Sequence, residues 1–223
     1  MIDNQWYAIT SSDTVKRGKL AGLRRFGENL LLFRDMKGKL GCVIDLCAHR
    51  GASLAKGCVS DGNIKCPFHG IEYDTSGKCV YIPSEGRNSA ADFSRFNLKS
   101  YETREIGGIV FAWYGDGLPD HEPDCFDVVT DKILILAYFI PVDDENSIIA
   151  LRFYNRITGV RFINKIIARI GSFANKVVER QDKRIVETQL PKASQLRMRE
   201  NLVAADMPII EYRSRRDKAI SRA

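Results

Sequence analysis

Two short segments of the chain each place one cysteine close to one histidine, and both residue types are metal ligands. The first segment is Cys47-Ala48-His49, and the second is Cys66-Pro67-Phe68-His69. Thiolate and imidazole are the donors that zinc and transition metals commonly take from proteins. Because His49 and His69 are two of only three histidines in the 223 residues, chance does not account for their pairing with cysteines. The spacing predicts a metal centre with two donors from each segment.

Two classes of metal site combine two cysteines with two histidines. A zinc finger groups cysteine with cysteine and histidine with histidine, whereas here each segment mixes the two. In a Rieske [2Fe–2S] cluster one iron takes two thiolates and the other takes two imidazoles, so each of two loops supplies one of each. The mixed segments therefore indicate one Rieske [2Fe–2S] cluster rather than zinc. Its predicted ligands are Cys47, His49, Cys66 and His69.

The composition is that of an ordinary globular protein with one large or two small domains. Apolar residues make up 44% and charged residues 28% of the chain, which are typical fractions. The net charge of +6 arises from 34 basic and 28 acidic residues, and the excess is even along the chain. This even distribution argues against a nucleic-acid-binding tail.

No segment of the sequence suggests a membrane or an export route. Residues 1–12 lack the charged and apolar regions of a signal peptide, and the longest apolar run, 133–140, is far shorter than a membrane span of about 20 residues. We therefore expect a cytoplasmic protein with no membrane partner, in which the remaining cysteines stay reduced. These cysteines are predicted to be small packing residues, with the last of them the most exposed: Cys42, Cys58, Cys79 and Cys125.

The first 118 residues are expected to form a mainly β domain of antiparallel sheets. Short β-rich runs alternate with turn residues such as Asp35-Met36-Lys37-Gly38, which is typical of hairpins. The expected hairpins pair 29–34 with 40–46, 71–73 with 78–81, and 98–105 with 109–114. Both Cys/His segments then fall on loops at the tips of neighbouring hairpins, where a rigid sheet can hold a redox centre near the surface.

Residues 119–223 are predicted to contain a linker, two strands and a helix. Residues 119–131 are acidic and contain two prolines, which is typical of a linker, and 132–142 and 147–157 are candidate strands. A helix is expected from about 160 to 190, where apolar residues recur with a period of about 3.6. Because one hairpin and one helix make a poor independent core, we expect 132–223 to pack on the β domain or on another chain, in a homo- or hetero-oligomer.

Around the predicted ligands the sequence resembles the Rieske domain in α subunits of the Rieske non-haem iron oxygenases, which include ring-hydroxylating dioxygenases and demethylase-like monooxygenases. The motifs are Cys47-Ala48-His49-Arg50-Gly51 and Cys66-Pro67-Phe68-His69-Gly70 through Tyr73-Asp74. The resemblance covers nearly all of residues 1–115. It implies a Rieske domain at 1–118, a linker at 119–131 and a truncated catalytic-domain-like segment at 132–223. That segment would have a helix-grip-like α+β fold with one long helix.

The resemblance also implies roles for the residues around the cluster. The two cysteines would bind the buried iron, and the two histidines would bind the outer iron, with their edges nearest to solvent or to a partner. Gly51 and Gly70 would let the backbone approach the sulfurs, with Arg50 in the same loop. Tyr73 would either donate a hydrogen bond near the cluster or serve only as a core aromatic residue.

Three positions separate this chain from the respiratory Rieske proteins, whose ligand loops carry an additional disulfide and a serine that donates to the cluster. Ala52 and Phe68 occupy the positions of those cysteines, and Ile71 occupies the position of the serine. Fewer hydrogen bonds to the sulfurs favour the oxidised, less negative state. The resemblance therefore implies a reduction potential toward the low end of the Rieske range of about −150 to +300 mV.

In the oxygenases a mononuclear iron is bound by two histidines and one carboxylate. Asp182, within 179–187, matches the position of the carboxylate, but the segment that supplies both histidines has no counterpart here. His121 is the one histidine left after the cluster ligands, and its neighbouring prolines and aspartates favour a solvated imidazole. A mononuclear iron held by this chain alone is therefore not expected, and Asp182 is a candidate ligand for a shared one.

Three functions are compatible with these residues. The first is an electron-transfer protein, or an oxygenase-like subunit without its own mononuclear iron site. The second is an oxygenase subunit whose iron site another chain completes, with Asp182 as the contributed ligand. The third is a redox-sensing or structural subunit. The expected partner is an electron-donating reductase or ferredoxin, no substrate is identified, and a self-sufficient oxygenase is not expected.

Overall fold

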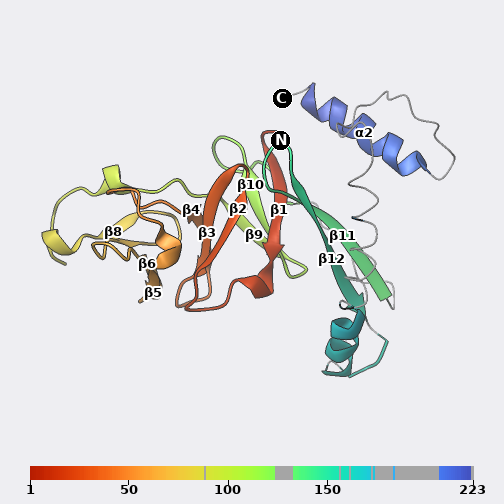
Figure 1. Cartoon of the computed structure of the whole chain (residues 1–223), viewed down its shortest axis with the longest axis horizontal. Helices are drawn as coiled ribbons and strands as arrows, with labels where there is room; N and C mark the ends of the chain where they lie inside the picture. The colour runs from red at the N-terminus through yellow and green to blue at the C-terminus, as the bar shows by residue number, and fades with distance from the viewer. Residues whose placement is uncertain are drawn as a thin grey trace. The chain divides into compact units, whose positions relative to one another are not determined.

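The computed structural model describes residues 1–87, 89–123, 133–155, 157–160, 162–171, 173, 183 and 206–221. The chain divides into two compact units, and Figure 1 labels most of their strands and the C-terminal helix. The first unit comprises residues 1, 3–126 and 139–149, and the second comprises 2, 127–138 and 150–223. Within the described part of the chain, no helix is long and apolar enough to cross a membrane.

Short antiparallel strands build the first unit, which confirms the predicted mainly β fold. They form three sheets with the strand orders β1-β10-β9, β2-β3-β4 and β5-β6-β7-β8. The predicted hairpins are confirmed as β3 with β4, β7 with β8, and β9 with β10. The strands are β1 Gln5–Ser11, β2 Ala21–Arg25, β3 Glu28–Arg34, β4 Leu40–Ile44, β5 Cys58–Ser60, β6 Asn63–Lys65, β7 Glu72–Tyr73, β8 Cys79–Tyr81, β9 Thr103–Ile106 and β10 Ile109–Tyr114. Four 3-10 turns connect them: η1 Ser12–Thr14, η2 Leu54–Lys56, η3 Pro83–Glu85 and η4 Ser94–Phe96.

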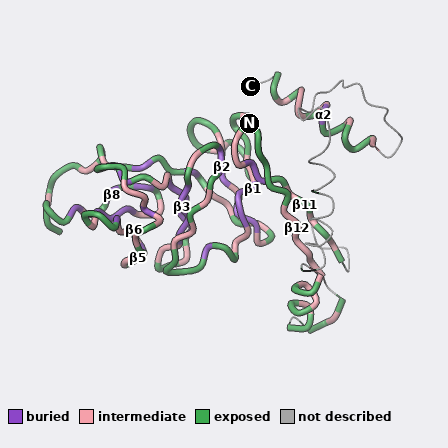
Figure 2. The backbone as a smooth tube through the Cα atoms, viewed as in Figure 1, coloured by how far each residue is buried: buried purple, intermediate pink, exposed green. Residues whose placement is uncertain are grey.

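Two apolar clusters form the core of this unit. One contains the predicted ligands Cys47 and Cys66 together with the fully buried side chains of Leu54, Ile64 and Tyr73. The other gathers inward-facing residues of β1, β3, β4 and β10. Figure 2 shows the buried stretches along β1 and β3. The side chains of both predicted thiolate ligands are therefore packed in the core, although both residues lie on loops.

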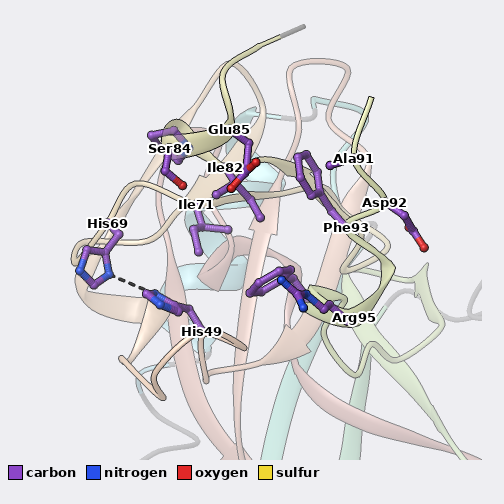
Figure 3. Close-up of a pocket in the computed structure, with 12 residues that line it drawn as sticks. His49, His69, Ile71, Ile82, Ser84, Glu85, Ala91, Asp92, Phe93 and Arg95 are labelled. Atoms are coloured by element: carbon purple, nitrogen blue, oxygen red, sulfur yellow. Dashed lines mark hydrogen bonds between the residues drawn. The ribbon is translucent and has the colours of Figure 1, made fainter. Parts of the chain in front are cut away.

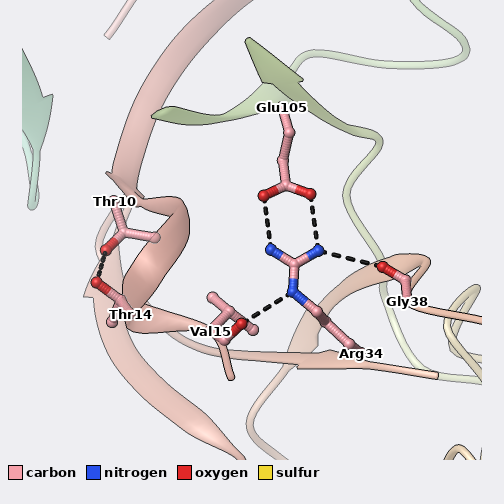
Figure 4. Close-up of polar contacts among 6 residues, drawn as sticks. All are labelled: Thr10, Thr14, Val15, Arg34, Gly38 and Glu105. Carbon is pink, nitrogen blue, oxygen red and sulfur yellow. Dashed lines mark hydrogen bonds and ion pairs between the residues drawn. The ribbon is translucent and has the colours of Figure 1, made fainter. Parts of the chain in front are cut away.

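An ion pair joins two of the sheets. Arg34 at the end of β3 meets Glu105 on β9 through two hydrogen bonds of 2.7 and 2.6 Å (Figure 4). The same guanidinium donates from Nε to the carbonyl of Val15 at 2.8 Å and from Nη1 to that of Gly38 at 3.1 Å. The hydrogen bonds from Arg34 hold the pKa of the Glu105 carboxyl below its usual value. This one side chain thus ties β9 to β3 and to two loops.

The candidate strands 132–142 and 147–157 are confirmed as β11 Ile133–Pro141 and β12 Ser147–Asn155, which form a two-stranded sheet. Residues 162–171 are helical, which agrees with the start of the helix expected from about 160 to 190. Most of that range, including Asp182, lies outside the described residues. Near the C-terminus the structure adds the helix α2 Met207–Ile220.

Candidate metal centre on two matching loops

The two Cys/His segments form loops with the same backbone hydrogen bonds. In the first loop, which follows β4, the N–H of Cys47 donates to the carbonyl of Ala52 at 2.8 Å. In the second loop, which follows β6, the N–H of Cys66 donates to the carbonyl of Ile71, also at 2.8 Å. A backbone hydrogen bond between each cysteine and the residue five positions later therefore closes each loop. The two loops present their cysteine and histidine in the same order.

A glycine shapes the turn of each loop. Gly51 has φ of +70° and Gly70 has φ of +72°, the left-handed region that costs other residues about 1–2 kcal/mol. Their N–H groups donate to the carbonyls of Cys47 at 2.9 Å and of Cys66 at 3.1 Å. The turn requires glycine at both positions for this reason.

The two imidazoles face one another at the surface (Figure 3). Nδ1 of His49 lies 3.1 Å from Nδ1 of His69, and both residues are exposed. Two nitrogens that bind one metal at about 2.0–2.1 Å, at an angle near tetrahedral, are separated by about 3.3 Å. The observed separation therefore fits two imidazoles that share one metal ion through Nδ1.

The two thiols lie behind the imidazoles in the core. Cys47 and Cys66 are each 3% exposed. Burial raises the pKa of the Cys66 thiol, while the backbone N–H groups of Phe68 and His69 act in the opposite direction. A buried thiolate needs such donors or a metal to balance its charge. Two buried sulfurs and two exposed imidazole nitrogens are the donor set that a [2Fe–2S] cluster of the Rieske type requires.

Tyr73 combines the two roles considered from the sequence. Its side chain is fully buried in the core, and its hydroxyl lies 3.2 Å from Sγ of Cys47. Burial raises the pKa of the phenol, so the hydroxyl remains protonated and acts as the donor when the sulfur is a thiolate. Tyr73 is therefore a core aromatic residue whose hydroxyl lies within hydrogen-bond distance of Cys47 Sγ.

A pocket of about 570 Å³ lies beside the two imidazoles, and sequence reasoning missed it. Its walls are formed by Ile71, by residues 82–85 after β8, and by residues 91–93, 95 and 96 (Figure 3). This connection is irregular apart from two 3-10 turns, so no hydrophobic period marks it in the sequence.

The remaining predicted residues fall in different places. Arg50 is exposed, and its guanidinium carbon lies 5.9 Å from the centre of the Phe68 ring. Cys42 and Cys79 are buried as predicted, but the packing role predicted for Cys58 is wrong, because β5 leaves that residue exposed. Asp182 and Cys125 lie outside the described residues.

His121 contacts tryptophan side chains of β1 and β10. Its ring packs on Trp113 with 5.1 Å between the centroids, and its backbone carbonyl accepts a hydrogen bond of 2.7 Å from Nε1 of Trp6. Nδ1 lies 2.6 Å from a carboxylate oxygen of Asp120. The imidazole is exposed, as predicted, but it also holds its segment against β1 and β10.

Residues 5–102 match the family model of the Rieske [2Fe-2S] domain. With the antiparallel sheets and the two matching Cys/His loops, this match defines the region as a Rieske [2Fe–2S] domain. The predicted cofactor of the chain, a [2Fe–2S] cluster, is confirmed by that match.

The proteins to which the chain is similar include oxygenases, as the resemblance implied. Chlorophyllide a oxygenase of Chlamydomonas reinhardtii, a protein named as chloroplastic, is 37% identical over 117 residues, which are 52% of this chain and 17% of that protein. A crystal structure of apo dicamba monooxygenase is 27% identical with a TM-score of 0.53, over 62% of this chain and 43% of the other. This chain therefore spans less than half the length of these two relatives.

A likeness of fold extends beyond the Rieske domain. The structure of NdmA from Pseudomonas putida CBB5 aligns with 97% of this chain and 93% of its own, with a TM-score of 0.73. The identity of 16% shows a shared fold and nothing about activity.

Proposed function

We propose that this chain transfers single electrons through its [2Fe–2S] cluster as a component related to the Rieske oxygenases. In this proposal Cys47 and Cys66 hold the inner iron through their sulfurs, and His49 and His69 hold the outer iron through Nδ1. The cluster would accept one electron and release it again. The protein residues supply the ligands, the protonated donor Tyr73, and an exposed imidazole edge.

One observation carries this proposal: the nitrogen pair is exposed while the sulfur pair is buried. Nδ1 of His49 and Nδ1 of His69 are 3.1 Å apart at the surface, and the thiols of Cys47 and Cys66 are 3% exposed. An electron can therefore enter or leave through the imidazoles without any opening of the core. Burial keeps solvent away from the sulfurs, and this helps the chain to retain the cluster.

The oxygenase relatives support a place for this domain in an oxygenase system. Electrons would come from a reductase or a ferredoxin, and they would leave toward an acceptor outside the Rieske domain. A cytoplasmic location, an oligomeric assembly and the domain limits 118 and 131 stay predictions from the sequence.

The proposal is tested by the metal content and redox behaviour of the full chain. We expect about two irons and two sulfides per chain and a reversible one-electron couple in protein-film voltammetry, below about +100 mV and toward the low end of the Rieske range. His69→Ala and Cys66→Ala should lose the cluster signal in electron paramagnetic resonance. The matched variants His121→Ala and Cys58→Ala should keep it. Bound zinc without sulfide, or loss of the cluster in the matched variants alone, would refute the assignment.

A further inference from the structure

Strand β8 carries one extra residue where it pairs with β7. Tyr81 lies opposite Glu72, and the next pair along the ladder is Cys79 with Tyr73. Val80 therefore has no residue opposite it on β7, which is a β-bulge. A regular register would place Val80 opposite Tyr73, and the bulge puts Cys79 there instead. Bulges near functional sites commonly redirect a side chain in this way.

The bulge brings a buried thiol to the one tyrosine that reaches a cluster ligand. Cys79 is 3% exposed, whereas Val80 is 41% exposed. Directly opposed residues of an antiparallel pair lie on the same face, with their Cβ atoms about 4.5–5.5 Å apart. The Cys79 side chain therefore lies beside Tyr73, whose hydroxyl is 3.2 Å from Sγ of Cys47. All three belong to the same apolar cluster.

The start of β8 is fixed by a neighbouring segment. The N–H of Cys79 donates to Oδ1 of Asn97 at 3.0 Å, and the N–H of Leu98 donates to the carbonyl of Gly77 at 2.8 Å. Burial raises the pKa of the Cys79 thiol, and the charge of Cys47 adds to this effect. Cys79 is therefore an uncharged side chain whose backbone is held in place beside the tyrosine.

We propose that Cys79 is a positioning residue that keeps the Tyr73 hydroxyl at Sγ of Cys47 and so raises the reduction potential of the cluster. This inference rests on the proposed electron-transfer function and adds a residue that acts through Tyr73 rather than as a ligand. Core side chains are closely packed, so a smaller residue at position 79 would leave a space into which the ring can tilt. The hydrogen bond would then lengthen and would stabilise the reduced, more negative cluster less.

Cys42 is the matched control for Cys79. It is also a buried cysteine on a strand, with no exposed surface. It lies opposite Leu32 on β3, in the apolar cluster that contains neither Tyr73 nor the thiolate ligands. Loss of its thiol removes the same atoms from the core without emptying the space beside Tyr73.

The test is the reduction potential of the full cluster-bearing chain in protein-film voltammetry. Cys79→Ala should lower the potential in the same direction as Tyr73→Phe but by less, because the hydroxyl is still present. Cys79→Val refills the space and should restore most of the potential. Asn97→Ala leaves the core side chains unchanged but releases the N–H of Cys79, so it should also lower the potential. Cys42→Ala should leave the potential unchanged.

The Tyr73→Phe background separates positioning from a direct effect on the cluster. There, neither Cys79→Ala nor Asn97→Ala should shift the potential further, since no hydroxyl remains to be positioned. A full additional shift in that background would overturn the inference. Equal shifts for Cys79→Ala and Cys42→Ala would also overturn it, as would an unchanged potential for Cys79→Ala and Asn97→Ala with the cluster intact by electron paramagnetic resonance.

These outcomes leave the electron-transfer function standing, because the wild-type chain would still show its reversible one-electron couple. A wild-type chain that shows no such couple would instead overturn the proposed function, and this inference with it.

Discussion

Among single residues, Tyr73 links the core to the proposed cluster most directly. It has no exposed surface, and its hydroxyl reaches Sγ of Cys47. Its cross-strand neighbour on β8 is Cys79, which is also buried. A donor fixed in this way acts on the sulfur in both redox states, but more strongly on the reduced cluster, whose charge is more negative.

Replacement of Tyr73 by phenylalanine should lower the reduction potential. The change removes the hydroxyl and keeps the ring in the core. A hydrogen bond that is about 1 kcal/mol stronger to the reduced cluster than to the oxidised one corresponds to about 40 mV for a one-electron couple. Protein-film voltammetry of Tyr73→Phe measures the shift, with Tyr81→Phe on β8 as the control. An unchanged potential, with the cluster intact, would mean that the hydroxyl does not act on the sulfur.

The ligand residues could be predicted from the sequence, but their surroundings could not. Cys47, His49, Cys66 and His69 are recognisable because metal chemistry fixes both residue type and spacing along the chain. The exposure of Phe68 and the pocket beside the imidazoles depend on how irregular loops pack, and no local pattern encodes that. Cys58 was misassigned because its burial depends on the place of β5 in its sheet rather than on its residue type.

At the level of elements, local pairings were predictable and distant ones were not. The turn residues predict β3–β4 and β9–β10, since each pair is joined by a short loop. By contrast, β1 pairs with β10 from the far end of the domain, with Gln5 opposite Tyr114. The helix α2 was not predicted, because its charged residues interrupt any apolar face. Contacts such as Arg34 with Glu105 follow only from the arrangement of the sheets.

Glu105→Gln should destabilise the domain in a pH-dependent way. At pH 7 the loss of the paired hydrogen bonds to Arg34 should lower the free energy of unfolding by about 1–2 kcal/mol. The folded-state pKa of Glu105 is depressed, so its contribution is complete above the usual pKa of about 4.3 and disappears as the pH falls through the folded-state value. The difference between wild type and Glu105→Gln should therefore shrink below about pH 4.

Urea unfolding at pH 7 and at pH 3.5 or so, followed by circular dichroism, checks this prediction. Glu145→Gln, at an exposed carboxylate, is the control and should change stability by less than about 0.5 kcal/mol. A constant difference between wild type and Glu105→Gln across this pH range would contradict the role of the ion pair.

At the scale of the whole molecule, the turn of the β11–β12 hairpin belongs to the same unit as the Rieske domain. Residues 139–149 are part of that unit. The N–H of Gly27 donates to the carbonyl of Val142 at 2.8 Å, and the N-terminal amino group of Met1 lies 3.3 Å from Asp144. Ile140 is only 4% exposed. The sequence led us to expect that residues 132–223 pack on the β domain or on another chain, but nothing in the residues of a hairpin turn specifies which distant residues it contacts.

Ile140→Ala should destabilise the first unit by about 2–4 kcal/mol, since it removes buried methyl groups and leaves a cavity. Ile148→Ala, at a residue 44% exposed in the same hairpin, should cost about 1 kcal/mol or less. Thermal unfolding of the full chain, followed through the visible absorption of the cluster, measures both variants. Equal effects of the two variants would show that the hairpin turn does not stabilise the Rieske domain.

The matching backbone hydrogen bonds of the two ligand loops bear on how the cluster is inserted into the chain. The hydrogen bonds that close each loop, and the glycines that permit the turns, are made entirely within the chain. Ligands fixed in this way lose little conformational entropy when they capture an inorganic cofactor. Folding of the loops and insertion of iron and sulfide can then be separate events.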